Sequence, residues 1–353
     1  MTTRWSMLLR LAVPAAMTLL LLSGRGMAVN AWDEELGTDV DAIAKKVEFD
    51  MSGWGKVHGS KGGGGQIPYL QALKQPPKRV ALVSFYAYDP GNTKGFGSPA
   101  FGGRTETTRQ LTKDGASTVA TILHDQGIAA FKEQFKAHGM ELLTPDEFAD
   151  TDAKREFFEN FEMKVGLGVK LFKSAEGGGK ENKLSKNQVL SAVAPGYRLF
   201  RLVYGENVRP MKSVDGKISV SMGSDLPKGL GVDAVVVVCN YCKATKKEGL
   251  LEGIYLYMFG PNPVPGEDTA TYWPGHLYVG VRLDGMSVPM LTFGKAEKVS
   301  SSGGMTPFGG WESSALSEAG ITGVDVAGYE RALGAIGKRA ASFVQEWSTK
   351  KED

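Results

Sequence analysis

The sequence predicts an α/β fold in which a mixed β-sheet is flanked by helices and a C-terminal helix docks on it, with an α+β arrangement as the alternative. Segments of strand and helix character alternate along the chain, which is typical of this class. Residues 235–238 are four consecutive valines, and such a run is typical of a strand covered on both faces. Residues 326–347 carry apolar side chains at alternating spacings of three and four, the stripe of a helix that packs on one side.

The first 31 residues have the pattern of a secretory signal peptide. Arg4 and Arg10 supply the positive start, and residues 11–22 form an apolar stretch that is shorter than the roughly 20 residues of a membrane span. Residues 26–28 and 29–31 each end in alanine with a small-x-small spacing, so cleavage is expected after one of them. We therefore expect a periplasmic or secreted protein without a stable membrane span after cleavage. An uncleaved anchor is the alternative.

Residues 32–77 are expected to form an amino-terminal arm and a Gly-rich linker. Residues 39–47 suit a short helix, and a lysine followed by four glycines at 61–65 interrupts regular structure. That cluster lacks the GxxxxGK[ST] pattern between a strand and a helix that a phosphate-binding loop requires. Residues 78–353 are expected to form a single α/β domain with an insertion around 164–224.

The first half of that domain is expected to alternate strands and helices. Residues 78–86 and 140–143 suit strands, and residues 117–137 suit a helix in which Gly127 costs about 1 kcal/mol relative to alanine and marks a kink. Thr144 and Glu147 have capping-box spacing with a proline between them, which predicts helix through 145–163. Residues 89–103 form a long Gly- and Pro-rich loop. Its aromatic residues are expected to pack on the domain, with a contact surface as the alternative.

The second half is expected to be richer in strands. Residues 197–203, 235–238 and 254–258 suit strands, residues 216–222 suit a strand or an edge hairpin, and residues 226–230 suit the last turn of a helix. Asp284 and Gly285 form a turn signal between strands at 277–283 and 288–293. Residues 261–276 are expected to be a loop and residues 300–310 a Ser/Gly-rich connection. A helix over 325–347 closes the chain.

Composition and motifs give no catalytic assignment. Lys plus Arg number 41 against 39 Asp plus Glu, so no overall field favours nucleic acid. GxSxG and HExxH are absent from the sequence, and no GxGxxG follows a predicted strand. The four histidines, at 58, 124, 138 and 276, are scattered. We assign no catalytic residue, no metal ligand and no cofactor.

Cys239 and Cys242 form the one group of residues whose types and spacing suggest a chemical role. They are a candidate disulfide or redox pair. The CxxC spacing is shared by thiol oxidoreductases, zinc sites and haem attachment. An active thiolate belongs at a helix start, whereas this pair continues a strand. Residues three apart on a regular strand point to opposite faces about 10 Å apart, so a disulfide requires a local bulge. Buried structural thiols or a local disulfide are the favoured interpretation, with redox and metal roles as alternatives.

The order of these segments resembles a known α/β domain. A strand, a loop, a helix, a strand and a helix are followed by residues 226–238 and a returning strand at 253–258. Gly231, Val232, Asp233 and Ala234 precede the valine strand. This pattern resembles the domain of the periplasmic part of the curli secretion channel subunit, the TolB amino-terminal domain and the outer-membrane lipoprotein activators of penicillin-binding proteins. The chain departs from these families in lacking a lipobox cysteine, in the insertion at 164–224 and in the CxxC.

The resemblance implies a non-catalytic part of a cell-envelope assembly. We therefore expect an exported binding or scaffold protein whose partner is another envelope protein and which does not bind nucleic acid. An exported enzyme with a dispersed active site, or a CxxC thiol oxidoreductase, are the alternatives.

Overall fold

A computed structural model describes residues 30–49, 75–89, 92–96, 103–164, 190–202, 216–245, 247–261, 276–295, 297–305 and 311–349. Contacts divide the chain into Met1–Asn30 and Ala31–Asp353, and the described helices and strands belong to the second unit. The predicted signal peptide, the glycine cluster at 61–65, most of the loop at 261–276 and His58 lie outside the described residues.

The main sheet is mixed, as the sequence predicts. Its strands lie in the order β1 (Glu48–Phe49), β9 (Leu277–Phe293), β8 (Glu248–Phe259), β7 (Ala234–Ala244), β2 (Arg79–Asp89) and β5 (Glu141–Leu143), with β12 (Ile321–Val324) also on β9 and β6 (Leu190–Val193) also on β2. Strand β2 is parallel to β5 and to β7, whereas β8 is antiparallel to both of its neighbours, β7 and β9. Because β7 and β2 lie inside the sheet, the valines of both strands and the aromatic residues of β2 are buried on both faces.

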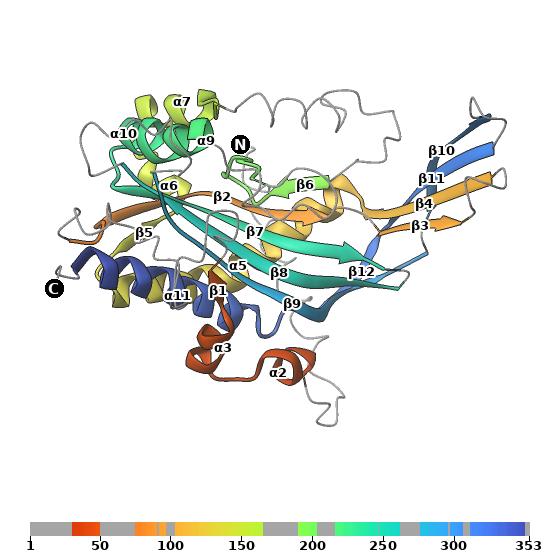
Figure 1. The fold of residues 1–353 in the computed structure, drawn as a ribbon, viewed down its shortest axis with the longest axis horizontal. Helices are drawn as coiled ribbons and strands as arrows, with labels where there is room; N and C mark the ends of the chain where they lie inside the picture. The colour runs from red at the N-terminus through yellow and green to blue at the C-terminus, as the bar shows by residue number, and fades with distance from the viewer. Residues whose placement is uncertain are drawn as a thin grey trace, which may run out of the picture. The chain divides into compact units, whose positions relative to one another are not determined.

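Helices cover both faces of this sheet (Figure 1). The first face is covered by α5 (Lys113–Ala137), α11 (Tyr329–Thr349), α2 (Ala31–Leu36) and α3 (Val40–Lys46). The second face is covered by α6 (Pro145–Phe148), α7 (Asp152–Asn160), α9 (Gly216–Val220), a π-helical turn (Ser221–Asp225) and α10 (Leu226–Leu230). The predicted α/β fold with a docked C-terminal helix is therefore confirmed.

The Gly231–Ala234 motif ties the starts of the two central parallel strands together. Gly231 ends α10 with a left-handed backbone (φ 67°). The Asp233 carboxylate then accepts hydrogen bonds from the backbone N–H groups of Lys78 (2.8 Å) and Arg79 (2.9 Å). Charge-assisted bonds of this kind are stronger than neutral ones, so Asp233 helps to set the register of β2 against β7.

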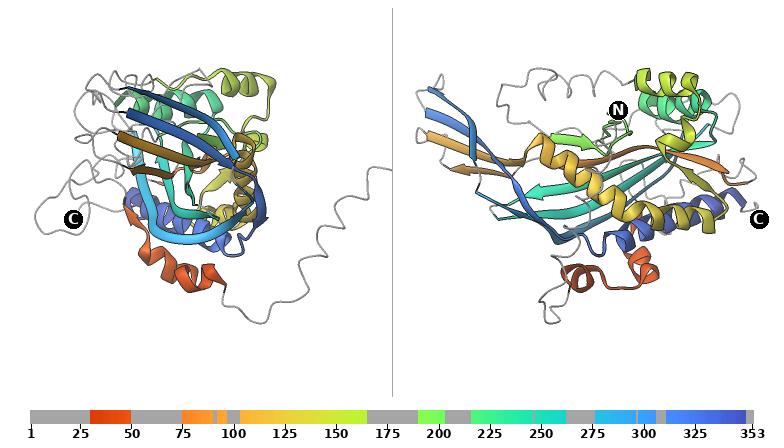
Figure 2. Two further views of the ribbon diagram at one scale, coloured as in Figure 1. Left: turned by 90° about the vertical axis from the view of Figure 1, so that its right-hand side faces the viewer. Right: turned by 180° about the vertical axis from the view of Figure 1, so that it is seen from behind.

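A second, smaller sheet is built from two hairpins far apart in the sequence. The first is β3 (Asn92–Phe96) with β4 (Gly103–Leu111), and the second is β10 (Glu297–Met305) with β11 (Trp311–Ala319). Their order is β10-β11-β4-β3. We call these four strands the hairpin sheet. Figure 1 shows the four strands side by side, and Figure 2 shows them from two further directions.

Several local predictions are wrong. The turn expected at Asp284 and Gly285 is a bulge inside β9, because β8 pairs with that strand on both sides of it and Gly285 has φ 76°. Residues 216–222 are helical instead of extended. The segment around 197–203 forms no strand over its described residues, and β6 lies at 190–193 instead. The loop at 89–103 and the connection at 300–310 contain strands β3 and β10.

The amino-terminal arm packs on the domain over its first part. Trp32 and Ile43 are fully buried in the core of the first face. The Asp33 carboxylate pairs with Arg331, and the Asp41 carboxylate pairs with Lys338. Residues 31–49 therefore belong to the α/β unit because their apolar side chains and carboxylates are matched by α11.

Candidate functional site

The first hairpin is rooted by a buried carboxylate. Asp89, the last residue of β2, is 1% exposed, and its carboxylate accepts a hydrogen bond of 2.8 Å from the backbone N–H of Leu111 at the end of β4. The next residue, Thr112, caps α5 by accepting a hydrogen bond from the N–H of Gly115 (2.9 Å). The two ends of the first hairpin are thus joined at the point where the sheet meets α5.

The second hairpin is rooted at the end of β9, which is separated from β2 by β8 and β7 in the main sheet. Gly294 donates its N–H to the carbonyl of Gly320 (3.0 Å), which closes the base, and β12 then pairs with the end of β9. Asp325 follows, donating its N–H to Met290 (2.8 Å) and accepting a hydrogen bond at its carbonyl from the Trp32 indole (3.1 Å). Backbone hydrogen bonds, together with the Trp32 indole of the amino-terminal arm, therefore fix the base of the second hairpin.

The two hairpins are joined through their inner strands. Strands β4 and β11 run parallel, in register from Gly103 opposite Trp311 to Leu111 opposite Ala319. Among the described residues, β3 and β10 each have a neighbour on one side alone, so they are the edges of the hairpin sheet. Such edges carry N–H and C=O groups able to pair with a further strand. The hairpin sheet is therefore the candidate contact site.

A buried polar cluster lies where the carboxyl ends of β2 and β7 meet, the position where α/β proteins commonly bind ligands. On the first face, Asn240 is fully buried. Its amide oxygen accepts a hydrogen bond from the Tyr329 hydroxyl (2.6 Å), and its amide nitrogen donates to the Tyr86 carbonyl (3.3 Å). Burial, and after it the neighbouring Cys242, raises the pKa of Tyr329 well above its usual range, so the phenol stays protonated. The arrangement joins α11 to the sheet.

On the second face the cluster is aromatic and cationic. The Tyr86 hydroxyl accepts a hydrogen bond from the N–H of Leu202 (3.4 Å), and burial raises its pKa well above the usual range. The Arg201 guanidinium lies 5.9 Å from the centre of the Tyr88 ring, a cation–π distance. Tyr241 also packs against Tyr88, with ring centroids 5.5 Å apart. These contacts order the end of the sheet nearest the first hairpin.

The structure places Cys239 and Cys242 in different cores. Cys239 belongs to the core of the second face and Cys242 to that of the first. Both are free and buried. Burial raises the pKa of Cys239 to about 12, and burial followed by the Asp89 carboxylate raises that of Cys242. The sheet thus lies between the two thiols, and they are not bonded to each other in this structure.

We expect both thiols to be unreactive in the native protein. A thiol-specific reagent such as Ellman's reagent should titrate neither Cys239 nor Cys242 at pH 8, and it should titrate both in denaturant. Replacing each by serine should lower the free energy of unfolding by about 1–3 kcal/mol, because a hydroxyl is more costly to bury than a thiol. Rapid labelling of the folded protein at either position would contradict this placement.

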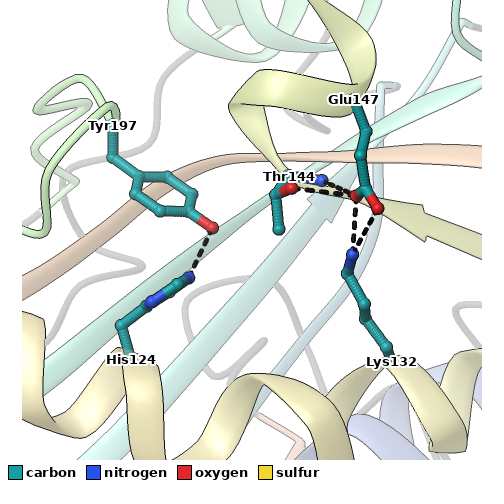
Figure 3. Close-up of polar contacts among 5 residues, drawn as sticks. All are labelled: His124, Lys132, Thr144, Glu147 and Tyr197. Carbon is teal, nitrogen blue, oxygen red and sulfur yellow. Dashed lines mark hydrogen bonds and ion pairs between the residues drawn. The ribbon is translucent and has the colours of Figure 1, made fainter.

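A row of polar side chains links α5 to the segments that follow β5 and β6 (Figure 3). The Tyr197 hydroxyl lies 2.8 Å from Nε2 of His124, and Nδ1 of His124 lies 3.0 Å from the Asp125 carboxylate. Burial, and then the carboxylates of Glu147, Asp146 and Asp125, raises the pKa of Tyr197. Its phenol therefore stays protonated while it shares a hydrogen bond with Nε2 of His124. Tyr197 is buried and Asp125 exposed, so the row fixes α5 against the 194–200 segment.

Beside this row, Glu147 closes the predicted capping box. Its carboxylate accepts hydrogen bonds from the Thr144 N–H (2.7 Å) and hydroxyl (2.8 Å) and from Lys132 on α5 (2.6 and 2.7 Å). Burial by itself raises the pKa of Glu147, but the hydrogen bonds from Lys132 and Thr144 outweigh it. The resulting pKa lies below the ordinary value of 4.5.

This depressed pKa predicts an acid-dependent stability. A lowered folded-state pKa stabilises the protein above pH 4.5 and loses that effect as the pH falls through the folded value. Glu147→Gln should therefore lower the unfolding free energy at pH 7 by less than about 1 kcal/mol, since solvent screens so exposed a pair. Urea unfolding should show that the difference in unfolding free energy between the native protein and Glu147→Gln shrinks as the pH falls below 4.5. In a Lys132→Met background most of that difference should be absent. A difference that does not change with pH would contradict the assignment.

The remaining histidines of the described residues have structural surroundings. Nδ1 of His138 lies 2.7 Å from the Gln134 carbonyl, and Nδ1 of the buried His276 lies 3.2 Å from the Gly260 carbonyl. The backbone N–H of His276 donates to the Ser219 hydroxyl (3.2 Å). Within the described ranges, no three His, Cys, Asp or Glu side chains gather in a group that would hold a metal ion. No helix in those ranges has the length and apolar character needed to cross the membrane.

Comparison with known proteins gives no relative: no family model, no curated protein and no solved structure matches this chain.

Sequence reasoning missed the hairpin sheet and the buried polar cluster. Strand β4 carries a signal, since residues 104–111 hold several threonines and end in leucine, whereas β10 is mostly serine and glycine and has weak strand propensity. Asp89 and Asn240 are of residue types that are common in loops. Only the alignment of β2 with β7 brings both to the carboxyl end of the main sheet.

Proposed function

We propose that this chain is an exported protein of the cell envelope, periplasmic or secreted, that binds or scaffolds other proteins through protein–protein contacts. The observation that carries the proposal is the hairpin sheet. Four strands from two distant parts of the chain align along β4 and β11 and leave β3 and β10 at the edges. Edge strands are the usual place where a protein adds a strand from a partner.

The roots of the hairpins support a contact role. Asp89 and Leu111 fix one root, and Gly294 and Gly320 fix the other. A binding element held at both roots loses less conformational freedom on association, and this favours affinity. The polar cluster behind the roots is saturated by Asn240, Tyr329 and Tyr86, which suits a positioning role better than a reaction.

The sequence adds the compartment and the class. The amino-terminal pattern is that of a signal peptide. The order of elements resembles envelope assembly domains, and resemblance in fold is an associational argument for function. Both lead to the same kind of partner, another envelope protein.

Affinity capture from native envelopes tests the proposal. Tagged protein should retain a specific partner after mild cross-linking. A variant with proline in both edge strands, Lys94→Pro with Ser302→Pro, should retain at least tenfold less, because proline removes a backbone donor and disfavours pairing. Circular dichroism and thermal unfolding must show that the main sheet is unaffected. Equal capture by both proteins, or a protein that never leaves the cytoplasm, would contradict the proposal.

A further inference from the structure

The two edges of the hairpin sheet differ in how well they are protected. Natural edge strands avoid unwanted pairing by being short, by carrying charged residues or proline, or by bulging. Strand β3 has five residues with Lys94 at the central position. Strand β10 has nine residues, and its irregularity lies at its base, between Lys298 and Ser300.

Beyond that irregularity β10 has no such protection. Residues 300–305 read Ser-Ser-Ser-Gly-Gly-Met, with neither charge nor proline, and they pair with β11 without a break from Leu316 to Trp311. Small residues also let a second backbone approach closely. Among the described residues, β10 is therefore the edge of the hairpin sheet best suited to accept another strand.

Two-fold symmetry indicates which strand could pair with β10: the same strand of a second copy of the chain. In a two-fold antiparallel pair, each residue lies opposite a residue of its own strand in the second copy. For β3 this would place Lys94 opposite Lys94 at the central register position, and like charges directly opposite are destabilising. For residues 300–305 of β10, every pairing joins small or apolar uncharged residues. The charge pattern thus permits self-pairing at β10 and opposes it at β3.

We propose that two copies of this chain associate through residues 300–305 of β10, in antiparallel pairing that joins two hairpin sheets into one. The order across the joined sheet is β3-β4-β11-β10 followed by β10-β11-β4-β3 of the second copy. This rests on the proposed contact role of the hairpin sheet and names one partner for it. A six-residue pairing is a small interface, so association is weak and depends on concentration.

Sedimentation equilibrium of the purified full chain, with concentrations up to about 200 µM to cover weak affinities, tests the proposal. A monomer–dimer equilibrium is expected. Proline is introduced separately at Ser301 and Ser302, because neighbouring N–H groups on a strand point to opposite sides. One of the two N–H groups therefore faces the second copy, and its loss should raise the dimer dissociation constant at least tenfold. The control, Thr93→Pro in β3, should leave the constant unchanged.

Cysteine scanning keeps the test decisive if a proline variant fails to fold. The native thiols are buried, so single cysteines at positions 300–304 report on new contacts. Oxidation should give disulfide-linked dimers with a maximum at the position nearest the two-fold axis, and Thr93→Cys should give none. A monomer without cross-links overturns the inference but leaves partner binding in envelopes open. Assemblies larger than two, or dimers that survive both prolines, overturn it as well.

Discussion

Replacing Asn240 by alanine is expected to lower the free energy of unfolding by about 2–4 kcal/mol, combining a cavity with unpaired polar groups. Asn240 is fully buried and joins the Tyr329 hydroxyl on α11 to the Tyr86 carbonyl on β2. Without it, both groups stay buried and lose a partner. Urea unfolding at pH 7 measures the loss.

A double-mutant cycle separates the hydrogen bond from the cavity. Tyr329→Phe alone should cost about 1–2 kcal/mol because it leaves the Asn240 oxygen unpaired. The double variant should cost less than the sum of the two, by about 0.5–3 kcal/mol, as expected for residues in direct contact. Additive costs would show that this hydrogen bond does not hold α11 to the sheet.

Replacing Gly127 by alanine is expected to destabilise the protein although alanine is the better helix former. A Cβ atom at position 127 would lie 2.6 Å from Leu333 and 2.8 Å from the Tyr329 ring, both on α11. Overpacking of this kind costs about 1–3 kcal/mol, which exceeds the helix-propensity gain of about 1 kcal/mol. Thermal unfolding should therefore show a lower midpoint for Gly127→Ala.

Gly334 supplies a matched control on the facing helix. A Cβ atom there would lie 3.8 Å from Ala130, an ordinary contact distance. Gly334→Ala should therefore stabilise the protein by up to about 1 kcal/mol through helix propensity alone. If both variants shifted the midpoint in the same direction, the close packing of α5 on α11 at Gly127 would be wrong. At Gly127, where the sequence predicts a kink, the structure shows close packing of α5 on α11.

The sequence was sufficient for elements whose signals are local. The valines at 235–238 predicted β7, Thr144 and Glu147 predicted the cap of α6, and the apolar stripe at 326–347 predicted α11. In each case the same residues that carry the signal also make the stabilising contacts. At these positions local conformational preference and tertiary packing favour the same structure, so the sequence pattern predicts the structure correctly.

Prediction failed where a distant partner decides the structure. Asp284 and Gly285 look like a turn, but β8 pairs on both sides of them and absorbs the extra residues as a bulge. Residues 300–305 look like a linker, and β11 makes them a strand. Trp32 belongs to the predicted arm, and its burial in the core of the first face, with its indole bonded to the Asp325 carbonyl, has no signal in the sequence around it. These structures depend on contacts between residues far apart in the sequence, which a short stretch of sequence does not contain.

The buried polar cluster could not be predicted from the sequence for the same reason. Asp89 and Asn240 are 151 positions apart in the numbering, and both come to the carboxyl end of the main sheet only through the register of β2 with β7, in which Ala87 lies opposite Asn240. The CxxC drew attention in the sequence because its spacing is familiar. On a strand that spacing sends the two thiols to opposite cores, so Cys239 and Cys242 serve packing on both faces.

Site-specific photo-cross-linking in intact cells tests the contact role of the hairpin sheet most directly. A photoreactive amino acid is placed at Thr93 in β3 or Ser301 in β10, and at the exposed Lys136 on α5 or Glu156 on α7 as controls. The account predicts discrete protein adducts from the hairpin-sheet positions and few from the helices. Adducts confined to the helices, or none from β3 and β10 in a correctly exported protein, would contradict it.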